Sequence, residues 1–177
     1  MSVLIALFVA ALQAPSTGPN INYPSGPRIK YRKWKLGFSD GYKEKRLTDR
    51  EWKVGAQSGI GAAKDLALLT TLYRSAVIAK STGYSHFFTT KMDVGNWSHS
   101  YGPLISYSVN YQEVFSRIVL HNANDPIPAC QERGKFAVNC RDQSADEIIA
   151  IVGPLLGQDA AALENEIRLV RGQINSR

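Results

Sequence analysis

The sequence has few of the side chains that bind metals. It contains two cysteines and three histidines among 177 residues. His86, His99 and His121 stand far apart and form neither an i, i+4 pair nor the cysteine–histidine cluster of a zinc site. No local motif therefore predicts a metal, a cofactor or a catalytic residue. A hydrolase or metal-dependent enzyme built from dispersed residues is the alternative, and its carboxylates would come from Asp93, Asp125 and Asp142.

Two glycine-containing segments lack a residue that a catalytic motif requires. Gly59-Ile60-Gly61 lies between a predicted strand and a predicted helix, but position 64 is Lys where a dinucleotide-binding loop needs its third glycine. In residues 55–59 the serine stands one position away from the centre of a G-x-S-x-G nucleophile elbow. We therefore expect neither a Rossmann nucleotide site nor an α/β-hydrolase nucleophile.

The sequence also lacks an apolar run long enough to cross a bilayer. Residues 3–12 are apolar throughout, but a membrane-spanning helix needs about 20 such residues. A short run followed by small residues is typical of a signal peptide, so we expect a leader over residues 1–14, cleaved between Ala10 and Ala14. The alternatives are a buried N-terminal helix or a start codon placed too far downstream. Residues 15–28 are rich in Pro, Gly and Ser and are predicted to form a tether.

The positive charge is concentrated in one part of the chain. The net charge is +6, and between Arg28 and Lys53 ten basic residues stand against four acidic ones. Such a strip favours anionic partners, and its predicted contact residues are Lys30, Arg32, Lys33 and Lys35. In an exported protein the partner would be envelope lipid or polysaccharide, with peripheral membrane contact. Two alternatives are lysines that only protect a sheet edge, and nucleic-acid binding if the chain is not exported.

The apolar spacing predicts an α+β fold. Strands are expected over residues 42–46, 50–56 and 84–91, a helix over 62–82 ended by Gly83, a loop over 93–103, and two more strands over 105–111 and 114–120. Ser144 and Glu147 form a capping box before a helix disturbed at Pro154, and residues 159–176 form a last amphipathic helix. We expect a two-layer sandwich, in which an antiparallel sheet packs against one long helix, with additional C-terminal helices. The domain would span residues 29–157, followed by the C-terminal helix over 158–177.

The two cysteines are predicted to pair with each other. Cys130 and Cys140 are an even count in an oxidising compartment, and Gly134 between them permits a turn. Two separate buried thiols are the alternative if the chain is not exported.

Four short segments are similar to those of a known family. They are Gly37-Phe38-Ser39-Asp40-Gly41-Tyr42, Leu47 with Trp52-Lys53-Val54, Tyr73-Arg74-Ser75-Ala76, and Gly83-Tyr84-Ser85-His86-Phe87-Phe88. Together they resemble a family of small bacterial envelope lipoproteins with a strand-strand-helix-strand core, a likeness that covers residues 37–91. The resemblance implies export and an α+β sandwich, and it assigns no activity. Such lipoproteins carry a cysteine after the leader, and this chain has none there, so we expect a soluble periplasmic form.

Overall fold

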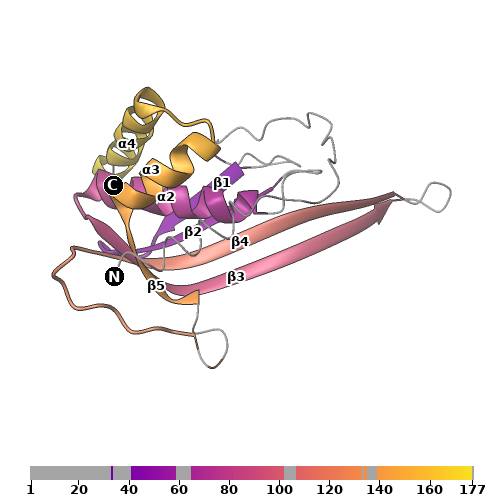
Figure 1. Cartoon of the computed structure of the whole chain (residues 1–177), viewed down its shortest axis with the longest axis horizontal. Helices are drawn as coiled ribbons and strands as arrows, with labels where there is room; N and C mark the ends of the chain where they lie inside the picture. The colour runs from indigo at the N-terminus through magenta and orange to yellow at the C-terminus, as the bar shows by residue number, and fades with distance from the viewer. Residues whose placement is uncertain are drawn as a thin grey trace, which may run out of the picture.

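A five-stranded sheet and three helices form the part of the chain that the structure describes. The computed structural model describes residues 33, 41–58, 65–101, 107–132, 134 and 139–176. All neighbouring strands are antiparallel, in the order β1-β2-β4-β3-β5 (Figure 1). The elements are β1 (Gly41–Arg46), β2 (Glu51–Gln57), α2 (Leu66–Thr82), β3 (His86–Tyr101), β4 (Tyr107–His121), β5 (Arg141–Ser144), α3 (Ala145–Leu155) and α4 (Ala160–Asn175). The predicted α+β class, with one long helix against the sheet and further C-terminal helices, is confirmed.

Helix α2 lies between the sheet and the other two helices (Figure 1). On the sheet side, Ala76 packs in one buried cluster with Trp52 of β2. On the other side, Tyr73 and Val77 pack in a second cluster with Val170 of α4. Small residues toward the sheet allow the helix backbone to approach it closely, and burial of apolar area on both sides holds the layers together.

The helix ends follow local signals that the sequence shows. Gly83 ends α2 in the left-handed conformation, with φ 85°, which a glycine adopts without steric cost. Ser144 accepts a hydrogen bond from the backbone N–H of Glu147 at the start of α3, as the capping box predicts. Pro154 lies in the last turn of α3. The predicted start of the long helix at Ala62 lies outside the described residues.

Strand β2 confirms the predicted two-residue alternation. Trp52, Val54 and Ala56 are buried beneath α2, with 3%, 0% and 1% of their surface exposed. Tyr42 of β1, opposite Ala56, is buried on the same face. Lys53 between them is exposed on the other face.

The prediction of a loop at residue 93 and of two strands after it was wrong. Strand β3 continues through Asp93 to Tyr101, and β4 is one strand that pairs with β3 along its whole length. The Gly, Asn and Ser residues that favoured a loop alternate with Trp, His and Tyr, and cross-strand pairing outweighs their weak intrinsic preference. Strand β5 was not predicted, because its four polar residues carry no apolar pattern.

Candidate functional site

The face of the sheet opposite α2 carries a group of lysines around one aromatic ring. We call Lys43, Lys45, Lys53 and Phe115 the cationic face. Lys43 Nζ lies 4.3 Å and Lys53 Nζ 4.9 Å from the centre of the Phe115 ring, on its π face. The cation–π contacts hold two ammonium groups over a single platform that the strands β1, β2 and β4 build together.

A glycine makes room for that platform. Gly55 of β2 pairs with Phe115 of β4. A β-carbon at Gly55 would lie 2.7 Å from Cε1 of Phe115, which is closer than van der Waals contact permits. The ring therefore lies against the glycine backbone, and any side chain at position 55 would displace it.

Two of the lysines stand directly opposite each other. Lys45 of β1 and Lys53 of β2 are cross-strand partners on the exposed face. Within the described residues, neither has a carboxylate at ion-pair distance. Like charges in such a pair destabilise a sheet. Other cations on this face are neutralised, since Lys43 pairs with Glu113 at 3.1 Å and Arg117 pairs with Glu51 at 2.7 Å.

A second charged cluster is buried between α2, β1 and α4. The guanidinium of Arg74, which is 0% exposed, contacts Glu44 at 2.5 and 2.8 Å and Glu166 at 2.5 Å. It also lies 4.2 Å from the centre of the Tyr42 ring, whose hydroxyl donates to Glu166 at 2.9 Å. Burial raises the pKa of Tyr42 well above its usual 10.0. This cluster joins three elements around a fully buried guanidinium, so we assign it to the fold.

The structure brings two of the three histidines together. The rings of His86 and His121 lie 5.6 Å apart. His121 is 2% exposed, and its Nε2 and Nδ1 lie 2.8 Å from Asp142 Oδ1 and 2.9 Å from the carbonyl oxygen of Asn122. His86 Nδ1 contacts the Ser85 hydroxyl at 2.9 Å. Because both nitrogens of His121 face protein oxygens, this ring anchors β4 to β5 and to the following loop.

The three aspartates proposed for a dispersed catalytic or metal site do not lie together; each has a different partner. Asp142 joins His121, whereas Asp93 pairs with Lys91 and Asp125 lies 3.9 Å from Arg50. The pairing of β3 with β5 brings Asp142 to His121. No local sequence pattern predicts this contact. Over the described ranges, no group of three His, Cys, Asp or Glu residues is placed to hold a metal ion.

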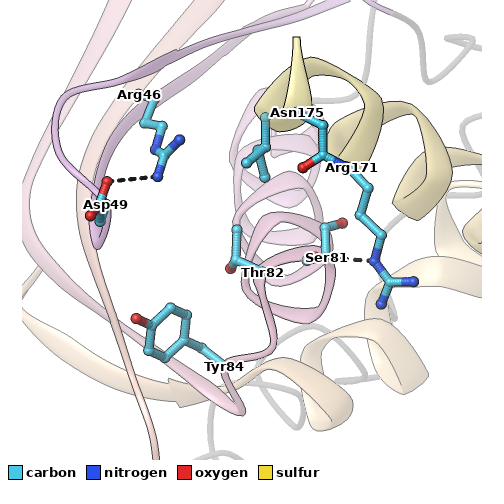
Figure 2. Close-up of a pocket in the computed structure, with 8 residues that line it drawn as sticks. Arg46, Asp49, Ser81, Thr82, Tyr84, Arg171 and Asn175 are labelled. Carbon is cyan, nitrogen blue, oxygen red and sulfur yellow. Dashed lines mark hydrogen bonds and ion pairs between the residues drawn. The ribbon is translucent and has the colours of Figure 1, made fainter. Parts of the chain in front are cut away.

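A cavity of about 450 Å³ lies where α2 ends beside α4 (Figure 2). Figure 2 shows Arg46 pointing toward the helices, with its guanidinium bound to Asp49 at 2.7 Å, while Arg171 points away on the far side. Arg171 Nε donates to the carbonyl oxygen of Ser81 at 3.2 Å. The two cations therefore do not converge on one ligand. The remaining lining residues are Thr82, Tyr84, Ile174 and Asn175.

Of the predicted anion-contact residues, the structure describes one. Lys33 forms an isolated parallel bridge with Tyr42. With the Gln173 amide oriented to satisfy its neighbours, Gln173 accepts from Lys33 Nζ at 3.3 Å and donates to Glu44 at 3.1 Å. Lys30, Arg32 and Lys35 lie outside the described residues. The cationic face was not singled out from the sequence, because the pairing of Gly55 with Phe115 depends on strand register.

The predicted disulfide joins Cys130 and Cys140, with an S–S distance of 2.07 Å. Its segment docks on β3 at the β-bulge that interrupts the register between Thr89 and Lys91. The carbonyl oxygen of Thr90 accepts a hydrogen bond from the Gln131 N–H at 3.0 Å, and Cys140 Sγ lies 3.1 Å from the same oxygen. The bridge thus fastens this loop to the sheet.

No protein-family model, curated protein or solved structure matches this chain. None of the three described helices is both long and apolar enough to cross a membrane.

Proposed function

We propose that this protein is an exported, non-enzymatic binding module that contacts an anionic surface of the bacterial cell envelope through its cationic face. The observation that carries the proposal is the opposed pair of Lys45 and Lys53. Two lysines at directly opposed positions without a carboxylate reduce stability unless an anion lies over them. Phosphate groups of lipid or polysaccharide supply that charge.

Edge protection does not account for both lysines. Lysines on an edge strand discourage pairing with another sheet, which fits Lys45 of β1. Strand β2, however, is hydrogen-bonded on both sides, to β1 and to β4. Lys53 therefore does not lie on a sheet edge, and edge protection does not explain its presence. Phe115 holds Lys53 on the surface beside Lys43. Lys43 is already paired with Glu113, so Lys45 and Lys53 are the two lysines that fit a surface of negative charge.

The disulfide supports the exported location. Such bonds persist in oxidising compartments and are rare in the cytosol. The bridge between Cys130 and Cys140 agrees with the leader that residues 3–12 predict. The family resemblance of residues 37–91 points the same way.

Cosedimentation with phosphatidylglycerol–phosphatidylcholine vesicles tests the proposal. Attraction to an anionic surface is worth about 1 kcal/mol per basic residue, so Lys45→Ser/Lys53→Ser should weaken binding about thirtyfold. Added salt should weaken wild-type binding steeply, because exposed charges are screened over about 10 Å at 0.1 M.

A control variant removes the same number of positive charges from a different part of the protein. Lys80→Ser/Arg168→Ser removes two positive charges from the helices α2 and α4 and should leave binding nearly unchanged. If the two double variants lose binding equally, net charge alone is responsible and the assignment to the cationic face is wrong. If wild-type protein ignores the anionic vesicles, the proposal as a whole fails.

A further inference from the structure

Four basic residues lie in one row across the sheet, each on a different strand. Lys45 of β1 is the cross-strand partner of Lys53 of β2, which is also the partner of Arg117 of β4. Arg117 is in turn the partner of Lys91 of β3. The four strands are neighbours in the sheet, as Figure 1 shows. We call Lys45, Lys53, Arg117 and Lys91 the basic ladder.

The ladder lies on the face of the sheet opposite α2. Ile118, the neighbour of Arg117 in β4, is buried in the cluster that includes α2, so Arg117 and its cross-strand partners point to the other face. Lys45 and Lys53 are exposed, and the side chains of Arg117 and Lys91 keep 42% and 49% of their surface exposed. Adjacent strands are about 4.8 Å apart, so the ladder extends over about 14 Å.

Such a row is unfavourable for the sheet itself. Like charges directly opposite each other weaken strand pairing, and the ladder repeats that arrangement from β1 to β3. Arg117 is compensated by Glu51 at 2.7 Å and Lys91 by Asp93 at 3.1 Å. Exposed ion pairs of this kind contribute little in water. The row therefore fits the binding of an anion better than it fits a contribution to stability.

The carboxylates of this face lie beside the ladder. Glu51 stands two residues before Lys53 in β2, on one side of the row. Asp93 stands two residues after Lys91 in β3, on the other side. A flat anionic surface that covers the whole face brings its charges against these carboxylates, whereas a chain that follows the row meets basic residues. A bilayer can still contact Lys45 and Lys53, but the complete ladder favours a linear partner.

We propose that the basic ladder binds a linear envelope polymer that carries phosphate groups along its length. Ammonium and guanidinium groups donate charge-assisted hydrogen bonds to phosphate oxygens. A chain laid across the strands places successive phosphates over successive ladder positions, and the long basic side chains adjust to its spacing. The inference rests on the proposed function and names the partner of the same face.

The two halves of the ladder differ in strength. Lys45 and Lys53 have no carboxylate at ion-pair distance in the part of the chain that the structure describes, so a short phosphate ligand binds there first. A longer chain also reaches Arg117 and Lys91, whose carboxylate partners it must compete with. Binding should therefore become tighter as the chain grows long enough to span the ladder.

Calorimetric titration with two inorganic phosphates tests the inference. Pyrophosphate reaches only one pair of neighbouring ladder residues, whereas a long polyphosphate chain spans all four. We expect Lys91→Gln/Arg117→Gln to weaken polyphosphate binding about tenfold and to leave pyrophosphate binding unchanged. Lys45→Ser/Lys53→Ser should weaken the binding of both probes.

A control variant removes two cations that lie off the ladder. Lys80→Gln/Arg168→Gln changes α2 and α4, and Lys80 pairs with Asp146 at 2.8 Å much as Lys91 pairs with Asp93. This variant should bind polyphosphate as wild type does, and thermal melts check that each variant keeps its fold. The logarithm of the polyphosphate affinity should fall with the logarithm of the salt concentration about half as steeply for Lys91→Gln/Arg117→Gln as for wild type, because two of four phosphate contacts are lost.

The outcomes separate the two proposals. If Lys45→Ser/Lys53→Ser loses vesicle and pyrophosphate binding while Lys91→Gln/Arg117→Gln binds polyphosphate as wild type does, the cationic face stands and the ladder is wrong. If Lys45→Ser/Lys53→Ser binds vesicles and both phosphates as wild type does, both proposals fail. Poly(glycerol phosphate) and oligothymidylate of equal charge identify the polymer. Tighter binding of the oligothymidylate would overturn the envelope polymer in favour of nucleic acid.

Discussion

The guanidinium of Arg74 on α2 donates two hydrogen bonds to the carboxylate of Glu44 on β1, with 0% and 3% of the two side chains exposed. Glu166 of α4 contacts the same guanidinium. One buried cation thus bridges two carboxylates that stand far apart in the sequence. This contact determines how the C-terminal helix and the first described strand are held against α2.

We expect Arg74→Met to lower the free energy of unfolding by about 3–5 kcal/mol. Removing one partner of a buried ion pair leaves the other charge desolvated and unpaired, and here two carboxylates lose their cation. Urea denaturation measures the change. Arg168→Met on the exposed side of α4 is the control, with an expected change within about 0.5 kcal/mol. A loss below about 1 kcal/mol for Arg74→Met would contradict the prediction.

Two buried tyrosines should make the protein sensitive to alkaline pH. Burial raises the pKa of Tyr73 from 10.0 to about 12, and the nearby Glu166 adds to the effect. The unfolded chain then ionises at lower pH than the folded one. The stabilising contribution is complete below pH 10 and is lost as the pH rises from 10 toward 12.

Tyr73→Phe tests this dependence. Denaturant melts between pH 9 and about 11 should show a shallower decline of stability for Tyr73→Phe than for wild type, by up to about 1.4 kcal/mol per pH unit. Tyr84→Phe serves as the comparison. Equal slopes for wild type and Tyr73→Phe would show that Tyr73 does not contribute.

The contact between Gly55 and Phe115 predicts a coupled pair of substitutions. Gly55→Ala should destabilise the protein by about 1–3 kcal/mol, because the new methyl group meets the ring. In a Phe115→Ala background the same change should cost much less, which a double-mutant cycle measures. Gly172→Ala on α4 meets nothing within 4 Å and should stabilise by about 0.5–1 kcal/mol. Additive effects of Gly55→Ala and Phe115→Ala would contradict the packing described above.

Reduction of the disulfide should weaken the fold without abolishing it. Closing the loop between Cys130 and Cys140 stabilises by roughly 2–3 kcal/mol in the chain-entropy model. The Cys130→Ser/Cys140→Ser variant should lose that amount in denaturant melts. Alkylation of native protein without reductant should label neither cysteine, and two labelled cysteines would mean that no bridge forms in the cell.

Export predicts a processed N-terminus. Mass spectrometry of protein isolated from its native host should find a chain that begins after a cut between Ala10 and Ala14, because small residues follow the apolar run. An intact Met1 or Ser2 in a cytoplasmic fraction would overturn both the leader and the proposed location.

Local signals in the sequence determined several elements of this protein. The spacing of apolar residues predicts α2 and α4, Gly83 ends α2, and Ser144 caps α3. Each of these features depends on residues within one or two turns of each other, so their physical causes are visible in a short window. The cysteine pairing also followed from the presence of only two cysteines.

Contacts between distant residues were decided by the tertiary structure alone. The outer part of the β3–β4 ladder forms because each strand supplies the hydrogen bonds that the other lacks, although the Gly, Asn and Ser residues of β3 favour a loop. Strand register places Lys45 opposite Lys53 and Phe115 over Gly55. A shift of one residue would exchange the faces, and no short window of sequence specifies that shift. The chain composition thus determined that the lysines and Phe115 are present, and the pairing of strands decided that they share one surface.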